Sequence, residues 1–237
     1  MKIIDKNNEL EALMMTYKQS KGEDYVSILN DLLDFIIGYL DPTCKPVEGW
    51  KHSGEENQLF SNMMNAYFAL IVEKVSYQIW YDAWGDLIMS MRAKGGGFEQ
   101  YFTPTSICNF LSSALIPFDD IGHEMTPCGV RAVISDPSCG SSRNLLSAHA
   151  MLSNNSKRAP YCIGEDIDML CCKISAVNLA VHGACGEIVC HDTISEPDTI
   201  RAGWLINHEL YNDDTGVPSI VRSNDKQKYH LFNDKGL

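Results

Sequence analysis

The first part of the chain carries apolar residues at helical spacing. One predicted helix face repeats every three or four positions and comprises Leu29, Leu32, Leu33, Ile36, Ile37 and Leu40. Ser53-Gly54-Glu55-Glu56 is a capping box, which predicts the start of a long helix that we expect to continue through Met91. The apolar stripe of that helix is more typical of a core than of a base-stacking surface, and it includes Tyr67, Leu70, Ile71, Trp80 and Trp84. We therefore predict a helical N-terminal domain over residues 1–94.

The pattern changes after Gly95-Gly96-Gly97, which marks the joint between two domains. Residues 132–146 combine a buried strand, a tight turn and the start of a helix. Two further apolar strands end in carboxylates, at Asp166 and at Asp192. Strands that alternate with helices predict an α/β fold over residues 95–237. A fourth strand is expected to end near Asn207, and residues 217–220 begin either another strand or a tail.

The turn at residues 136–142 has small residues where a helix begins. Asp136, Gly140, Ser141 and Ser142 would leave the first helical turn uncovered, so that free N–H groups face a ligand. Phosphate loops and dinucleotide loops share this design, but their glycine patterns are G-x-x-x-x-G-K-[ST] and G-x-G-x-x-G. Neither pattern occurs in this turn, which has one glycine. The turn therefore indicates a nucleotide-type site of another kind.

The sequence of this turn resembles a known cofactor loop. Asp136-Pro137-Ser138-Cys139-Gly140-Ser141 is similar to the S-adenosylmethionine (SAM) loop of adenine-N6 DNA methyltransferases, especially the modification subunits of type I restriction systems. Upstream, Phe102-Thr103-Pro104 resembles the family segment that closes over the methionine end of SAM. Downstream, residues 164–168 resemble the family's Gly-x-Glu-x-Asp, and the strand ending in Asp192 resembles the one that carries the adenine-binding carboxylate.

This resemblance implies a Rossmann-like class I SAM-dependent methyltransferase core behind the helical domain. In that fold the loop and residues 102–104 would hold the methionine end, Asp166 and Ile167 the ribose, and Asp192 the adenine. A carboxylate at a strand end suits a ribose because it accepts hydrogen bonds from two hydroxyls at once. Taken singly, each acid is more typical of a helix cap or a solvated turn, and the shared order favours the cofactor site.

Two neighbouring details follow the same family pattern. Thr103 is expected to cap a helix over residues 105–115, with Pro104 in its first position. Asn178-Leu179 followed by Gly183 resembles the family's Asn-Leu and glycine, which predicts where the helix after Asp168 ends.

The departures from the family pattern concern affinity and catalysis. Ser142 stands where a glycine is usual, and its side chain is expected to weaken cofactor binding. The catalytic tetrapeptide of the family, Asn or Asp followed by Pro-Pro and an aromatic residue, is absent, since the chain has no Pro-Pro. Asn207, at the end of the apolar stretch 204–206, is the nearest positional candidate for its first residue. Residues 193–237 leave room for only one or two more strands, so the core is abbreviated or is completed by another chain.

Composition and charge limit the partners. The chain has 237 residues, of which 45% are hydrophobic, which suits a globular protein with one core and a smaller attached domain. A formal net charge of -12 argues against autonomous DNA binding, although Lys157-Arg158 and residues 226–228 are short basic runs. No apolar segment predicts a membrane span, and the N-terminus lacks a signal-peptide core, so we expect a cytoplasmic protein without a membrane partner.

The nine cysteines favour reduced, buried thiols over a disulfide framework. Cys139 lies in the turn, and the others that we place in strands or a helix are Cys162, Cys171, Cys172 and Cys190. A zinc cluster of His182, Cys185, Cys190 and His191 is conceivable, but these residues span a helix end, a turn and a strand whose alternate residues face opposite ways. We therefore predict no metal site.

Three hypotheses follow for function. The first is a SAM-dependent transfer of a methyl group to adenine N6 in DNA. The second is a non-catalytic SAM-fold subunit that assembles with a partner methyltransferase or restriction protein, and the missing Pro-Pro motif supports it. The third, methyl transfer to a small molecule or a protein, is weaker because the loop and Phe102-Thr103-Pro104 resemble DNA enzymes in particular.

Overall fold

The computed structural model describes residues 6–43, 49–93, 95, 97–116, 122–156, 159–208 and 217–233. The chain forms two compact units. The first comprises Met1–Tyr39 and Cys44–Phe102, and the second comprises Leu40–Thr43 and Thr103–Leu237. The main boundary therefore lies inside the Phe102-Thr103-Pro104 segment. Lys157-Arg158, one of the two basic runs, lies outside the described residues.

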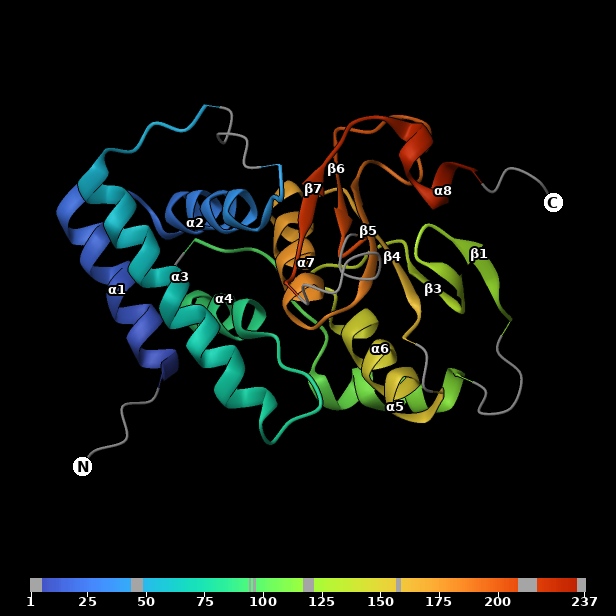
Figure 1. Cartoon of the computed structure of the whole chain (residues 1–237). Helices are drawn as coiled ribbons and strands as arrows, with labels where there is room; N and C mark the ends of the chain where they lie inside the picture. Colours follow the sequence, from blue (N-terminus) through green and yellow to red (C-terminus); the bar gives the residue numbers. More distant parts are fainter. Residues whose placement is uncertain are drawn as a thin grey trace. The chain divides into compact units, whose positions relative to one another are not determined.

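The first unit is helical. Its helices are α1 (Lys6–Lys21), α2 (Tyr25–Leu40), α3 (Gly54–Val75) and α4 (Ala83–Ala93) (Figure 1). The predicted apolar face of α2 is confirmed, because Leu29, Leu32, Leu33 and Ile36 are fully buried. The capping box is also confirmed, with the backbone N–H of Ser53 donating to Glu56 at 2.7 Å. An ion pair of Lys21 with Glu56 at 2.7 Å ties α1 to the start of α3.

The prediction of one helix through Met91 is wrong. The helix ends at Val75, where the Ser76 hydroxyl donates to the carbonyl of Glu73 at 2.6 Å. A new helix, α4, starts at Ala83, and the buried Asp82 accepts from the Gly85 N–H at 2.8 Å. Asp82 is an N-cap residue that lies inside the apolar stripe and marks the start of a new helix. The prediction of one long helix relied on hydrophobic periodicity, which does not detect such a residue.

The second unit is an α/β fold with a mostly parallel sheet. The strand order is β3-β4-β5-β6-β7. Its strands are β3 (Val133–Asp136), β4 (Tyr161–Asp166), β5 (Cys185–Cys190), β6 (Ala202–Ile206) and β7 (Ile220–Arg222). β3, β4 and β5 run parallel, whereas β6 is antiparallel to β5 and β7 is antiparallel to β6. A separate hairpin joins β1 (Glu124–Thr126) to β2 (Gly129–Arg131).

Helices cover the sheet. α6 (Arg143–Ser156) connects β3 to β4, and α7 (Met169–Val181) connects β4 to β5. Each helix connects a strand to the next strand of the sheet, and both connections run in the same direction along it. Because such connections are right-handed, α6 and α7 lie on the same face (Figure 1). The other elements of this unit are α5 (Thr105–Leu115), a short 3₁₀ helix η2 (Lys226–Lys228) and α8 (His230–Asn233).

The core explains the apolar character of the central strands. All six residues of β5 and the first five of β4 are buried, as expected for parallel strands covered on both faces. Gly186 permits the close pairing of these strands, since a Cβ at this position would lie 2.0 Å from the carbonyl oxygen of Cys162. Among the described residues, no helix is both long enough and apolar enough to cross a membrane.

Two local expectations need correction. α5 spans Thr105–Leu115 as predicted, but Pro104, not Thr103, occupies its N-cap position, and no side chain caps it. Cys128 and Cys185 form a disulfide in the structure, so the expectation of reduced thiols is wrong for this pair. The other described cysteines are buried and form no disulfide, including all five that we placed in the turn, strands and helix.

Candidate functional site

Three acidic side chains meet at one edge of the sheet. Because β3, β4 and β5 are parallel, their carboxyl ends lie together, and we call this the carboxyl edge. Asp136 ends β3, Asp166 ends β4, and Asp192 follows β5 by two residues. Each of the three is partly exposed. The fold therefore brings together acids that are far apart in the sequence.

The β3–α6 turn is fixed by its own polar groups. Asp136 accepts from the Ser138 N–H at 3.1 Å with one oxygen and from the Asn144 side-chain amide at 3.2 Å with the other. The Ser142 N–H donates to the Cys139 carbonyl at 2.7 Å, which closes the turn before α6 begins. These bonds hold the residues that resemble the SAM loop in one compact conformation.

Ser142 does not project from the turn. Its φ is 66°, a left-handed conformation that favours glycine, which explains why a glycine is usual at this position in the family. Its side chain is fully buried. The serine therefore costs backbone strain, and its hydroxyl lies inside the protein, so obstruction of the cofactor by this side chain is not supported.

Helix α7 supports the turn from behind. The Ser175 hydroxyl donates to the Gly140 carbonyl at 2.7 Å, and the Asn178 amide donates to the Ser141 carbonyl at 2.9 Å. Asn178 is fully buried, which gives a physical reason for the Asn in the family pattern. Burial also raises the pKa of the Cys139 thiol to about 12, so this cysteine is a neutral packing residue and not a nucleophile.

Asp166 links the second strand to the turn. One of its oxygens accepts from the Gly140 N–H at 2.9 Å, and the other accepts from the Asp168 N–H at 2.9 Å. Asp168 is the N-cap of α7 and accepts from the Leu170 and Cys171 N–H groups, so its carboxylate stabilises the start of this helix. Ile167, between the two acids, is 56% exposed and offers an apolar surface beside the carboxylates.

Asp192 holds the turn after β5. It accepts from the N–H groups of Ile194 at 3.0 Å and Ser195 at 2.8 Å. These two donors hold the pKa of Asp192 below its usual value, because they favour the charged form. The third strand end therefore carries an acceptor whose charged form is favoured.

Residues 102–104 straddle the boundary between the two units. Phe102 is buried in the first unit, whereas Thr103 and Pro104 belong to the second, and Pro104 is exposed. Within the second unit, the Arg143 guanidinium donates to the Thr103 carbonyl at 3.2 Å, which ties this segment to the first residue of α6.

A buried acid and imidazole pair at the carboxyl edge escaped the sequence analysis. Glu165 lies on β4, and His191 directly follows β5. A carboxylate oxygen of Glu165 lies 2.6 Å from Nε2 of His191. Both are more than nine-tenths buried, and the His191 ring also contacts Phe232. Successive side chains of a strand point to opposite faces, so Glu165 and Asp166 lie on different faces of the sheet. This alternation is the sequence signal that could have separated the buried acid from the one at the candidate site.

Asn207 lies away from the three acids. Because β6 is antiparallel to β5, Ile206 pairs with Gly186, so Asn207 follows β6 at the opposite, amino edge of the sheet. Its amide donates to the carbonyls of Ala180 and Ala184, at 3.0 and 2.9 Å, and its side-chain oxygen accepts from the Ser219 N–H at 2.8 Å. These bonds connect Asn207 to the end of α7, to the segment before β5 and to the segment before β7.

The zinc cluster considered from the sequence does not form. Cys185 and Cys190 are the first and last residues of β5, and five steps along a strand separate them by about 16 Å. One ion cannot bind both, so His182, Cys185, Cys190 and His191 are not a common site.

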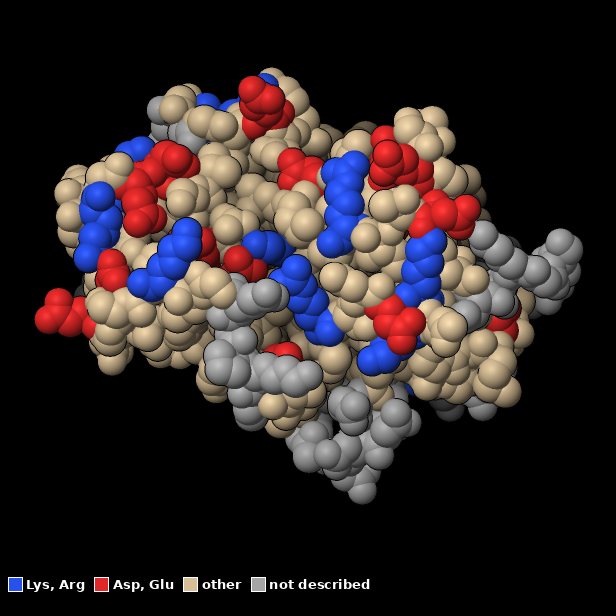
Figure 2. All heavy atoms as spheres, turned by 90° about the horizontal axis from the view of Figure 1, so that it is seen from above, with Lys and Arg blue, Asp and Glu red and all other residues tan. Residues whose placement is uncertain are grey.

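The charged surface shows no large basic field on the face in Figure 2, where acidic and basic side chains are interspersed. Lys226, in the second basic run, lies 4.0 Å from Asp198 and 5.2 Å above the Phe232 ring. This arrangement suits a solvated surface better than a phosphate-binding patch.

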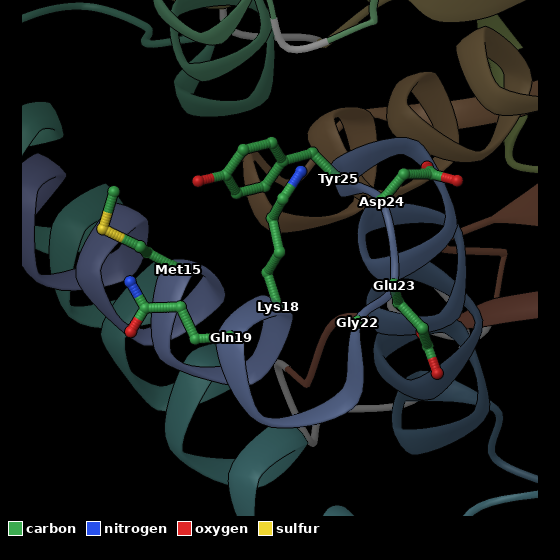
Figure 3. A pocket seen from close by; sticks show the side chains of 7 residues that line it. All are labelled: Met15, Lys18, Gln19, Gly22, Glu23, Asp24 and Tyr25. Atoms are coloured by element: carbon green, nitrogen blue, oxygen red, sulfur yellow. The ribbon is translucent and has the colours of Figure 1, made fainter.

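Two cavities lie in the helical unit, apart from the acids of the carboxyl edge. One of about 370 Å³ is formed at the turn between α1 and α2, where Lys18 stacks 4.2 Å from the Tyr25 ring (Figure 3). The other, of about 450 Å³, is lined by polar residues that include Asp31, His52 and Glu56. The His52 ring forms hydrogen bonds with the Tyr17 hydroxyl at 3.2 Å and with the Asp31 carboxylate at 2.9 Å. Both of its ring nitrogens are therefore engaged within the helical unit.

Comparison with one solved structure supports the fold, and a second similar structure aligns less closely. The chain aligns with a protein of Listeria monocytogenes that is assigned provisionally to the class I SAM-dependent methyltransferases, with a TM-score of 0.52 and 14% identity, over 98% of this chain and 64% of that one. It also aligns with the methyltransferase subunit of a type I restriction-modification system from Streptococcus thermophilus, with a TM-score of 0.40 and 18% identity, over 81% of this chain and 42% of that one. The chain therefore spans less than two thirds of either protein, and no curated protein matches it.

A family model gives the more specific result. The model described as N-6 DNA methylase matches residues 81–221, which is more than half of the chain and includes β3, β4, β5 and β6 in full and the start of β7. Together with the class I methyltransferase fold, this match implies SAM as the cofactor. The chain belongs to the N-6 DNA methylase family.

Proposed function

We propose that this protein binds SAM at the carboxyl edge of β3, β4 and β5, and that it takes part in methyl transfer to adenine N6 in DNA. The observation that carries the proposal is the convergence of Asp136, Asp166 and Asp192 around a turn that is linked to Asp166 through the Gly140 N–H. The residues present fit the cofactor, because they combine ionised acceptors, an exposed apolar side chain and a small-residue turn at a helix N-terminus.

The proposed roles follow from the chemistry of each group. Asp166 would accept from the ribose hydroxyls, and the exposed side chain of Ile167 would pack beside the base. Asp192 is ionised and would accept from the adenine amino group. The turn around Gly140 would hold the methionine end, which carries the only charged groups of the cofactor's tail. When bound, SAM supplies an activated methyl group on its sulfonium, and the chain's contribution is position and electrostatics.

A second candidate function is a SAM-binding subunit that needs a partner for catalysis. The placement of Asn207 at the amino edge favours it, because about 16–20 Å of strand separates this residue from the carboxyl edge. The chain also has no Pro-Pro to seat an extruded base, and its charge of -12 disfavours DNA binding alone. A partner protein would then supply the target base contacts and the target recognition.

The first experiment is a calorimetric titration with SAM and with its demethylated product. We expect binding, and we expect Asp166→Ala to weaken it by about 10- to 100-fold, the range for loss of hydrogen bonds to a charged group. Glu55→Ala is the matched control, since it removes an exposed carboxylate from the helical unit. Absence of binding to either ligand, or equal affinities for all three proteins, would contradict the proposed site.

A second experiment separates the two candidate functions. The protein is incubated with methyl-labelled SAM and unmethylated DNA, and the nucleosides are analysed for N6-methyladenine. Product with the isolated chain supports the enzyme, whereas SAM binding without product supports the partner-dependent subunit. Asn207→Ala should not change any activity that is found, because its side chain is turned to the amino edge.

A further inference from the structure

We propose that Cys128, Cys185 and His208 form a zinc-binding site at the amino edge of the sheet, independent of the proposed SAM site. The sulfur atoms of the two cysteines, which are joined as a disulfide in the structure, and a ring nitrogen of His208 all lie within 4.8 Å of one another. The three residues come from separate segments, since Cys128 is in the turn between β1 and β2, Cys185 begins β5, and His208 follows β6 by two residues. No two of them are close in the sequence, so the fold assembles the group.

The turn that carries Cys128 is held in place by hydrogen bonds. The Thr126 hydroxyl accepts from the Cys128 N–H at 3.2 Å and donates to the Gly129 carbonyl at 2.7 Å. Gly129 has a φ of 92°, which an L-residue rarely adopts, so this turn requires glycine. The Arg131 guanidinium donates to the Cys128 carbonyl at 2.9 Å and to the Ala159 carbonyl at 2.6 Å. A thiol on such a turn is pre-positioned to act as a ligand.

His208 is oriented through one of its two ring nitrogens. Nε2 lies 3.1 Å from the Gly186 carbonyl and 3.1 Å from the Tyr161 hydroxyl. The Tyr161 hydroxyl donates to Glu187 at 2.6 Å, so its oxygen accepts from His208, and both contacts assign the proton to Nε2. The ring lone pair is then on Nδ1. Histidines that bind metals usually hold their other N–H on a carbonyl or an acid in this way.

The set of donor atoms also suits zinc. Two thiolates and a neutral imidazole are a ligand set that zinc prefers, with Zn–S and Zn–N distances of about 2.3 and 2.0 Å.

The disulfide between Cys128 and Cys185 is the competing use of the same sulfur atoms. Their Cα atoms are 6.9 Å apart, at the upper end of the range for a direct bond, whereas an ion between two thiolates spans such a separation readily. A disulfide needs no third ligand atom, whereas a zinc ion does, and His208 provides one. We therefore assign the cluster to zinc when both thiols are reduced.

Three protein ligands leave one coordination position for water. Cys128 and His208 are half-buried, so solvent reaches the site, whereas Cys185 is fully buried. The bound ion would fasten the β1–β2 hairpin and the segment after β6 to β5. Because the ion binds only the folded chain, it should raise the stability of the protein in proportion to the logarithm of its concentration.

The test uses the full chain, reduced with a phosphine and then titrated with Co²⁺ as a spectroscopic substitute for Zn²⁺. We expect one ion per chain, with a thiolate-to-cobalt charge-transfer band in the near ultraviolet that Zn²⁺ abolishes. Cys128→Ser and His208→Ala should each weaken binding at least tenfold. Cys108→Ser is the matched control, because Cys108 is a buried cysteine of α5 in the same unit and is not part of the disulfide. Equal binding by all four proteins, or no band in the wild type, overturns the proposal.

A second measurement needs no variant. The reduced wild-type protein is alkylated with and without Zn²⁺, and the modified cysteines are located by peptide mass spectrometry. Zinc should protect Cys128 and Cys185, and a chelator should remove the protection. If these two thiols react equally in both conditions, or reoxidise to the disulfide in the presence of excess Zn²⁺, the site is a redox pair and not a metal site.

Discussion

Two groups of polar residues in the same sheet, the three aspartates of the carboxyl edge and the pair Asn207 and Glu187, are used in opposite ways. At the carboxyl edge, Asp136, Asp166 and Asp192 accept mainly from backbone N–H groups of turns and remain partly exposed. At the amino edge and the strand interiors behind it, Asn207 and Glu187 are fully buried and bonded to groups from several elements. The first arrangement leaves charge accessible to a ligand, and the second uses polar groups to join segments. Accessibility, more than polarity, therefore separates a candidate binding edge from a structural one.

The largest effect should come from Glu187. This carboxylate accepts from the Tyr161 hydroxyl at 2.6 Å and from the N–H groups of His230 and Leu231 at 2.8 and 2.7 Å. Glu187→Ala leaves three buried donors without an acceptor, so we expect a loss of about 4 kcal/mol in the free energy of unfolding. Urea denaturation followed by circular dichroism measures it. Exposed Glu196→Ala is the control, and a loss below about 1 kcal/mol for Glu187→Ala would show that the interior network is dispensable.

Asn207 should come next. Asn207→Ala removes three side-chain hydrogen bonds and places an alanine at a φ of 56°, so we expect a loss of about 3 kcal/mol. Asn207→Gly loses the same bonds without the backbone strain and should be about 1 kcal/mol less destabilised. SAM affinity should be unchanged in both variants. A fall in affinity with unchanged stability would instead place Asn207 at a functional site.

Acidification should lower the free energy of unfolding through His149, which lies on helix α6 between β3 and β4. Burial, with smaller contributions from His182 and Arg131, lowers the pKa of His149 on α6 to about 4. The unfolded chain binds this proton near pH 6.5, so stability that is present at pH 7 is lost as the pH falls toward 4. We expect a loss of about 1–2 kcal/mol between pH 7 and pH 5. His149→Gln should remove that part of the pH dependence, and an unchanged slope in this variant would assign the effect to other groups.

The sequence predicted the carboxyl edge better than the amino edge. The strand, turn and helix around Asp136 and the end of α7 near Gly183 follow local rules, because glycine, caps and apolar runs act within a few residues. The position of Asn207 at the amino edge could not be predicted, because the direction of β6 depends on its pairing with β5, which no local pattern encodes. Cys128 was overlooked because its partners Cys185 and His208 lie far along the chain, and only the fold brings them together.

The smallest expected change in stability is also the sharpest test of the comparison. Asp192 is partly exposed and its carboxylate accepts from two N–H groups of its own turn, so Asp192→Ala should change the free energy of unfolding little. The same substitution should weaken SAM binding clearly, because the base would lose its ionised acceptor. Urea denaturation and SAM titration on one preparation give both quantities, with Asn207→Gly as the opposite case. If Asp192→Ala instead unfolds the protein while its folded fraction binds SAM normally, the carboxyl edge is structural too, and the division between the two edges is wrong.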